Sequence, residues 1–118
     1  MRLAPTIAID FDGVIHSYTS GWTGIEDIPD PPVPGIREAI DDIRRAGYQV
    51  VIYSTRCVRQ TGQSAIIKWL DKYGIVVDDI VKEKPPAIVY IDDRAICFDG
   101  KPENLLNKIQ TFTPWNKR

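Results

Sequence analysis

Three short, continuous apolar runs, at residues 6–9, 49–53 and 87–91, restrict most strongly what this chain can fold into. None of them alternates apolar with polar residues, so each matches a strand that is covered on both faces. Between them, residues 36–43 and 66–73 repeat apolar side chains at helical spacing. Strand and helix patterns that alternate along a chain predict an α/β domain built on a parallel sheet.

The length of the chain fits one such domain. Its 118 residues suffice for a single hydrophobic core, and we expect one domain over residues 1–118. Residues 15–33 form a long irregular segment, which we expect to be a flap loop, and residues 111–118 are expected to be an exposed tail. Two further short strands are expected at residues 80–81 and 95–98, and a third helix at residues 105–109.

Charge and cysteine content exclude several classes of protein. The 15 basic and 16 acidic residues nearly cancel, so no overall field attracts a polyanion. Cys57 and Cys97 form no Cys-x-x-Cys pair, which argues against a zinc site and favours two reduced thiols. We find neither a signal peptide nor an apolar run long enough for a membrane helix. The sequence therefore predicts a cytoplasmic protein without membrane contact.

Each apolar run is followed by polar residues that are capable of chemistry. In open α/β sheets, ligands bind beyond the carboxyl ends of the strands, so we expect these side chains to meet at one edge of the sheet. They are Asp10 and Asp12 after the first run, Ser54, Thr55 and Arg56 after the second, and Asp92 and Asp93 after the third. Two lysines, Lys82 and Lys84, precede the third run.

Carboxylates crowded in this way limit the reaction that the site can support. They raise one another's pKa unless a cation lies among them. Oxygen ligands without His or Cys indicate Mg²⁺, which completes its shell with water and phosphate oxygens. A lysine and a hydroxyl can hold a phosphoryl group, and an aspartate can attack phosphorus to form an acyl phosphate. The residues themselves therefore predict metal-assisted phosphoryl transfer.

The same residues resemble the motifs of the haloacid dehalogenase (HAD) superfamily. Asp10-Phe11-Asp12-Gly13-Val14 is similar to the signature Asp-x-Asp-Gly-Thr/Val, and Ser54 resembles the second motif. Lys84 resembles the lysine of the third motif, and Asp92-Asp93 resembles the acidic fourth motif. The motifs occur in the family's order and span nearly the whole core. The resemblance implies a Rossmann-like parallel sheet of order 5-4-1-2-3 with helices on both faces. The family often carries an inserted cap domain, but no insertion in this chain is large enough for one, so we expect no cap domain.

The resemblance also implies a role for each residue. Asp10 is expected to be the nucleophile and a metal ligand, and Asp12 the general acid and base, whose backbone carbonyl also contacts the metal. Asp92 is expected to bind Mg²⁺ directly, and Asp93 directly or through water. Ser54 and Lys84 are expected to hold the phosphoryl group. The second acid, Asp12, favours hydrolysis of phosphomonoesters over dehalogenation.

Several alternatives remain open from the sequence. Lys82 competes with Lys84 as the phosphate-binding lysine, and Thr55 and Arg56 are further candidates for contact with the substrate. The lone histidine, His16, could reach the site, but a solvated or structural role is favoured for it.

The expected substrate is a phosphorylated small molecule or a nucleic-acid end. Ser54-Thr55-Arg56 and Asp92-Asp93-Arg94 are similar to motifs of phosphatase domains that act on polynucleotide ends. Tyr18 and Trp22 of the flap could stack on a base. A nucleotide or polynucleotide end is therefore favoured over a small sugar phosphate. The rival classes are a phospho-accepting, receiver-like signalling module and a catalytically idle binding protein.

Overall fold

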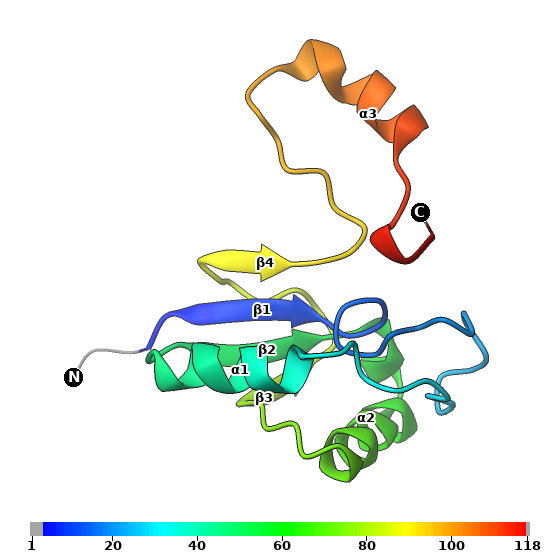
Figure 1. The fold of residues 1–118 in the computed structure, drawn as a ribbon, viewed down its shortest axis with the longest axis vertical. Coiled ribbons are helices and arrows are strands. Elements are labelled where there is room, and N and C mark those ends of the chain that lie inside the picture. The colour runs from blue at the N-terminus through cyan, green and yellow to red at the C-terminus, as the bar shows by residue number, and fades with distance from the viewer. Residues whose placement is uncertain (1–3, 118) are drawn as a thin grey trace.

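The structure, a computed structural model that describes residues 4–117, is built on one four-stranded parallel sheet (Figure 1). The order of the strands across the sheet is β3-β2-β1-β4. Their bounds are β1 (Thr6–Asp10), β2 (Gln49–Tyr53), β3 (Asp79–Val81) and β4 (Val89–Ile91). All three adjacent pairs are parallel, so the predicted α/β class is confirmed.

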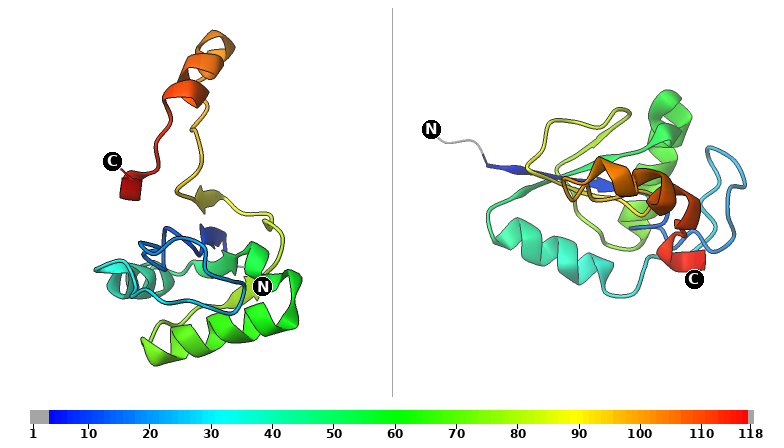
Figure 2. Two further views of the ribbon diagram at one scale, coloured as in Figure 1. Left: turned by 90° about the vertical axis from the view of Figure 1, so that its right-hand side faces the viewer. Right: turned by 90° about the horizontal axis from the view of Figure 1, so that it is seen from above.

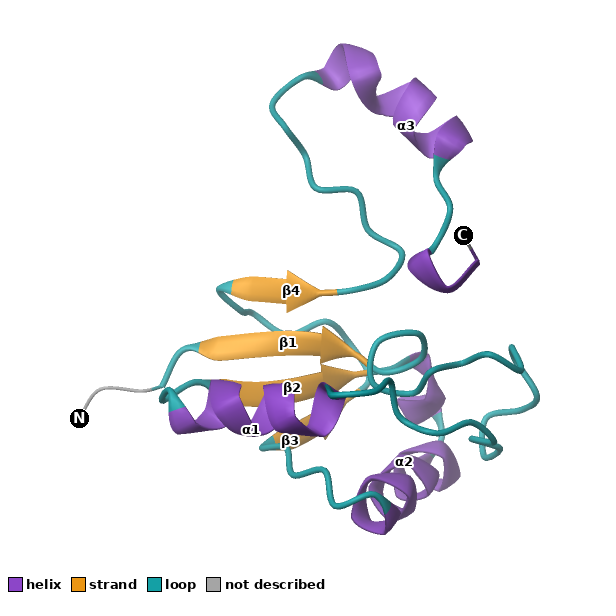
Figure 3. Cartoon of the chain, viewed as in Figure 1, coloured by secondary structure: helices purple, strands orange, loops and turns teal. Residues whose placement is uncertain are grey.

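Three α-helices accompany the sheet (Figure 3). They are α1 (Ile36–Arg45), α2 (Gln60–Lys72) and α3 (Leu105–Thr111), and the short 3₁₀ helices are η1 (Thr55–Val58), η2 (Pro102–Asn104) and η3 (Trp115–Lys117). The three predicted helices are confirmed. Among residues 4–117, no helix has the length and apolar character needed to cross a membrane.

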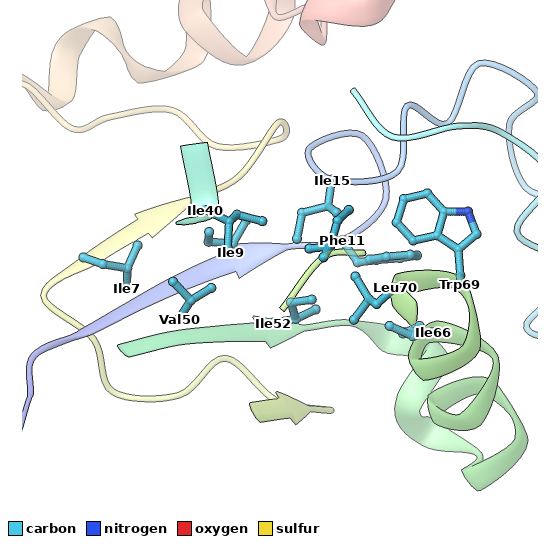
Figure 4. Packing of buried hydrophobic residues seen from close by; sticks show 11 residues of the cluster. Ile7, Ile9, Phe11, Ile15, Ile40, Val50, Ile52, Ile66, Trp69 and Leu70 are labelled. Carbon is cyan, nitrogen blue, oxygen red and sulfur yellow. The ribbon is translucent and has the colours of Figure 1, made fainter. Parts of the chain in front are cut away.

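The hydrophobic core lies on one face of the sheet, between the strands and two helices. Ile7 pairs in register with Val50, and Ile9 with Ile52, so these four side chains point to the same face. They pack in one cluster with Ile40 of α1 and with three residues of α2 (Figure 4). The α2 residues are Ile66, Trp69 and Leu70. Both helices therefore cover the same face.

The opposite face lacks the helical cover that we expected. Connections between parallel strands are right-handed, which sends the β3–β4 crossover over this second face. That crossover, residues 82–88, contains no helix, because seven residues are too few for a crossover helix. It instead lays Lys84 over the rings of Tyr53 and Tyr90, with its Nζ 5.3 and 5.1 Å from the ring centroids. The expectation of helices on both faces is therefore wrong.

The expected fifth strand is also absent from the part of the chain that the structure describes. Residues 95–98 belong to no strand. The chain instead leaves the sheet after β4, carries α3 away from the other elements, and returns near the carboxyl end of β1 (Figures 1 and 2). The observed order agrees with the four strands 4-1-2-3 of the expected sheet, and only its outer strand is missing.

Candidate active site

Three carboxylates meet where β1 and β4 end. Asp10 is the last residue of β1, and Asp92 and Asp93 follow β4 directly. Since Ile9 of β1 pairs with Ile91 of β4, the two strand ends lie side by side. One oxygen from each of the three carboxylates lies within 4.8 Å of the others, and all three residues are partly buried. The parallel pairing of β1 and β4 therefore creates a compact acidic cluster.

The electrostatics of this cluster suit a bound cation. Burial raises the pKa of Asp10 to about 8, with further contributions from a hydrogen bond to Asp93 and from the negative charges of Asp92 and Asp93. Oδ1 of Asp93 is buried and has no hydrogen-bond partner among the described residues. An unpaired carboxylate oxygen close to two other carboxylates is costly unless a cation or a proton compensates it. The donor set, oxygen only, fits a hard cation such as a divalent metal ion.

Gly13 allows Asp93 to approach the loop that follows β1. Its φ of 88° lies in the left-handed region, and a Cβ at this position would collide with the carboxylate of Asp93. A residue with a side chain would therefore be strained and would push Asp93 out of the cluster. The Asp-x-Asp-Gly sequence thus requires a glycine at this position for steric reasons.

Tyr53 holds Asp92, and our sequence analysis missed it. Its hydroxyl donates a hydrogen bond of 2.6 Å to Oδ2 of Asp92, while Oδ1 accepts from the backbone N–H of Arg94 at 2.8 Å. Burial and the hydrogen bond to Asp92 raise the pKa of the Tyr53 hydroxyl, which keeps it a donor. The sequence did point to Tyr53, because it is the last residue of the second apolar run. In the parallel register it pairs with Asp10.

Asp12 turns its carboxylate towards two donors rather than into the acidic cluster. His16 Nδ1 lies 2.8 Å from Oδ1 of Asp12, and Arg56 Nε lies 2.9 Å from Oδ2. Burial by itself raises the pKa of Asp12, but the hydrogen bonds from His16 and Arg56 outweigh it and hold this pKa below its usual range. Asp12 is therefore maintained as a carboxylate.

His16 is fully buried and connects Asp12 with Asp30, near the C-terminal end of the flap. Its Nε2 accepts a hydrogen bond of 3.1 Å from the backbone N–H of Asp30, so Nδ1 carries the proton that reaches Asp12. Trp69 of α2 donates from Nε1 to the carbonyl of Asp30 at 3.1 Å. Of the two roles that the sequence favoured for His16, solvated or structural, the structure shows the buried, structural one, in direct contact with Asp12.

Arg56 lies inside the protein, although we expected it to contact the substrate. Its side chain is 0% exposed. Besides Asp12, it binds three flap carbonyls through one nitrogen, those of Gly24 at 2.7 Å, Ile25 at 2.8 Å and Asp27 at 3.1 Å. Its guanidinium also lies 4.7 Å from the centre of the Trp22 ring. Arg56 therefore fastens the flap to Asp12.

The flap itself is an ordered loop closed at its base. Ser17 N–H donates to the carbonyl of Pro31, and Val33 N–H donates to that of Ile15. Further out, the backbone N–H and the hydroxyl of Ser20 both donate to the carboxylate of Asp30, at 2.8 and 2.6 Å. These bonds and those of Arg56 give residues 15–33 a defined position beside the site.

A cavity of about 420 Å³ connects the flap, the strand ends and the acidic cluster. Of the two candidate lysines, Lys82 lines it and Lys84 does not. Ser54 is 5% exposed, whereas its neighbour Thr55 is exposed. The complete lining is Asp10, Asp12, Tyr18, Trp22, Tyr53, Ser54, Thr55, Lys82, Asp92, Asp93 and Arg94. All the predicted site residues except Arg56 and Lys84 thus border one cavity.

A larger hollow, of about 750 Å³, lies between the flap and α2. None of the clustered carboxylates lines it. The smaller cavity is therefore the one in which the expected chemistry can take place.

Comparison with known proteins supports the fold. No protein-family model matches the chain, and no curated protein matches it. Among solved structures, a chain from the Pnkp1/Rnl/Hen1 complex is similar, with a TM-score of 0.53 and 20% sequence identity. The similarity covers 92% of this chain and 36% of that one. The protein thus shares its α/β fold with about a third of a chain in that complex.

The raised pKa of Asp10 predicts how the metal-free protein responds to pH. An unfolded Asp10 loses its proton near pH 3.8, whereas the folded one keeps it up to about pH 8. The stability contributed by the protonated form is complete below pH 3.8 and is lost as the pH rises through 8. Urea unfolding in EDTA at several pH values should therefore show stability that falls across this window.

Asp10→Asn should flatten that dependence, and so should added Mg²⁺. Asp71→Asn provides the matched control, because Asp71 is exposed on α2, and it should leave the slope unchanged. An equally steep slope in Asp10→Asn would contradict the assignment.

Proposed function

We propose that this chain is a Mg²⁺-dependent phosphohydrolase of the HAD type that cleaves phosphomonoesters through an aspartyl-phosphate at Asp10. The observation that carries the proposal is the grouping of Asp10 with Asp92 and Asp93 in the lining of a cavity that Ser54 and Lys82 also line. Carboxylates, a hydroxyl and a lysine around one space are the groups that phosphoryl transfer requires.

In the first step, an oxygen of Asp10 forms a bond to phosphorus as the bond to the leaving oxygen breaks, and the leaving oxygen takes up a proton from solvent water. Ser54 and Lys82 would hold the phosphoryl oxygens during this step. Bound among Asp10, Asp92 and Asp93, Mg²⁺ would offset the negative charge of the phosphoryl group and keep Asp10 ionised. Tyr53 would contribute indirectly, by fixing the orientation of Asp92.

In the second step, water attacks the aspartyl-phosphate, and Asp12 takes its proton as phosphate leaves. The hydrogen bonds from His16 and Arg56 favour the ionised carboxylate, which is the form that a general base needs. The same hydrogen bonds oppose the protonated form that a general acid needs in the first step. We therefore propose that Asp12 acts mainly as the base.

Among possible substrates, we propose a nucleotide or the phosphorylated end of a nucleic acid. The cavity is bordered by Tyr18 and by Trp22, whose side chain is 52% exposed, and an aromatic ring stacked on a base contributes roughly 1–3 kcal/mol. Lys82 and Arg94 at the same cavity are exposed cations that could contact further phosphates. The likeness to a chain of the Pnkp1/Rnl/Hen1 complex and the motif resemblance to polynucleotide-end phosphatase domains support the same choice.

Hydrolysis of an aryl phosphate tests the reaction itself. The wild-type protein should release phosphate with Mg²⁺ and lose this activity in EDTA. Asp10→Asn should reduce turnover to background, because the amide cannot attack phosphorus, while Asp71→Asn should retain full activity. Far-UV circular dichroism would confirm that both variants fold, and undiminished turnover in Asp10→Asn would disprove the mechanism.

The two lysines provide a matched pair for testing the phosphate contact. Lys82→Ala should lower kcat/KM for the aryl phosphate by about 10²-fold, the usual effect of removing one donor from a developing negative charge. Lys84→Ala should change it no more than a few-fold, since Lys84 lies over two tyrosine rings and away from the cavity. The opposite ranking would show that Lys84 is the phosphate-binding lysine.

Substrate choice is tested by comparing kcat/KM for nucleoside monophosphates, 3′- and 5′-phosphorylated oligonucleotides and sugar phosphates. We expect the first two groups to be preferred. Trp22→Ala should reduce that preference by roughly 5- to 150-fold, the equivalent of one stacked base, and Trp22→Phe should restore most of it. A preference for sugar phosphates, or an equal loss on every substrate in Trp22→Ala, would show that the flap does not select bases.

A further inference from the structure

Residues 94–117 form an arm that leaves the sheet after β4 and returns to the loop following β1 (Figures 1 and 2). Its return is fixed by a hydrogen bond of 2.7 Å from Nε1 of Trp115 to the carbonyl of Gly13. No residue of the arm is buried. The radius of gyration of the chain is 15.2 Å, compared with about 13.5 Å for a compact domain of this length. The arm is thus held at both ends, and none of its residues in between is buried.

Helix α3 presents an apolar face to solvent. Leu105, Leu106 and Ile109 follow the spacing i, i+1, i+4, which places them on one side of the helix, and Phe112 follows α3 directly in an extended conformation. Their exposed fractions range from 37% to 66%. A helix of seven residues is not stable in water without packing. This face therefore needs a surface to cover it.

The segment that leads to α3 has the properties of an unpaired strand. Residues 95–98 read Ala-Ile-Cys-Phe, and within the described chain their backbone groups make no hydrogen bond. Beside them, β4 pairs with β1 only, which leaves its other edge open. Ile88 and Val89 at that edge are 62% and 48% exposed. Open apolar edges of this kind readily accept another strand.

We propose that two copies of this chain form a symmetric dimer through the arm and the β4 edge. Residues 95–98 of each copy add a strand to the open edge of β4 in the other, and the apolar face of α3 closes over that edge. Each chain offers the open edge of β4 and one unpaired segment next to it in sequence, so a twofold arrangement satisfies both twice. A second copy is thus complementary to the first without any further component.

The available area is sufficient for such a dimer. Nine large apolar side chains of the arm and β4 edge are 37–66% exposed: Ile88, Val89, Tyr90, Phe98, Leu105, Leu106, Ile109, Phe112 and Trp115. Together they offer on the order of 800 Å² per copy, which is what each partner buries in an interface of standard size. Within the arm, Lys108 pairs with Asp99 at 2.7 Å, so these two charges offset each other.

Pairing of residues 95–98 with β4 of the same chain is disfavoured by the site. Only residues 92–94 connect the two segments, so a turn back onto β4 would have to form there. Asp92 is held in that stretch by Tyr53, and Asp93 by its place beside Asp10 and Gly13. A hairpin at this point would withdraw both carboxylates from the acidic cluster. Exchange between two chains leaves them in place.

Sedimentation equilibrium at micromolar concentrations tests the dimer. The wild type should be dimeric, and Leu106→Asp and Ile109→Asp should each weaken dimerisation at least tenfold, because a charge would be buried in the contact. Gln110→Asp introduces the same charge at an exposed polar position of α3 and should dimerise like the wild type. A wild type that is monomeric at 100 μM, or dimers unaffected by both apolar substitutions, would overturn the proposal. Circular dichroism spectra would confirm that every variant folds.

A disulfide between two different copies identifies the surfaces. One protein carries Cys57→Ser and retains the exposed Cys97; the other carries Cys57→Ser, Cys97→Ser and Val89→Cys. Opposed residues on paired strands lie within the reach of a disulfide, so oxidation of the mixture should give a mixed dimer. Companions with Ile88→Cys or Tyr90→Cys instead cover the neighbouring registers.

The same cysteines within one chain distinguish the alternative. If a protein with both Cys97 and Val89→Cys closes its disulfide at monomer mass, the arm folds onto its own β4 and the proposal is wrong. Absence of mixed dimers in all three registers would overturn it equally.

Discussion

The buried ion pair between Arg56 and Asp12 is the contact on which the arrangement of the site depends. A guanidinium with no exposed surface is tolerated only when a counter-charge and acceptors surround it. Here one carboxylate supplies the charge, and three carbonyls of the flap supply the acceptors. Loss of either partner would leave a charge unpaired in the interior, a penalty of about 3–5 kcal/mol. The position of the flap and the orientation of Asp12 are therefore fixed by the same side chain.

The residues that follow β2 therefore have different roles. Ser54 and Thr55 border the cavity, whereas Arg56, one position further, points into the protein. The 3₁₀ helix η1, which Ser54 caps by accepting from the backbone N–H of Arg56, separates them in this way. Neighbouring residues of one motif thus serve opposite sides of the site, one set facing the cavity and the other supporting the flap.

Much of the fold could be predicted from the sequence, because buried strands and helices have recognisable patterns of apolar residues. The apolar runs predicted β1, β2 and β4, and their polar ends predicted which side chains would meet. Contacts between residues far apart in the sequence have no such pattern. The orientation of Arg56 depends on carbonyls more than 25 residues away, and Lys84 was separated from Lys82 only by the path of the crossover over the second face. Residues 95–98 satisfy the pattern of a strand, but pairing decides whether a strand forms.

Only a few residues cover the second face of the sheet. A seven-residue crossover replaces a helix, and two tyrosines with one lysine close the surface behind the strand ends. The cavity is consequently bordered by one flap and one shallow layer of loops.

The three tryptophans lie at points where the site is held together. Trp22 stacks on Arg56, Trp69 donates to the carbonyl of Asp30, and Trp115 donates to that of Gly13. Indole emission is sensitive to a neighbouring cation and to the loss of a hydrogen bond. The protein therefore carries three built-in fluorophores that view the flap from its tip, the flap from its base and the loop beside the acidic cluster, so that single-tryptophan versions would follow each region separately in real time.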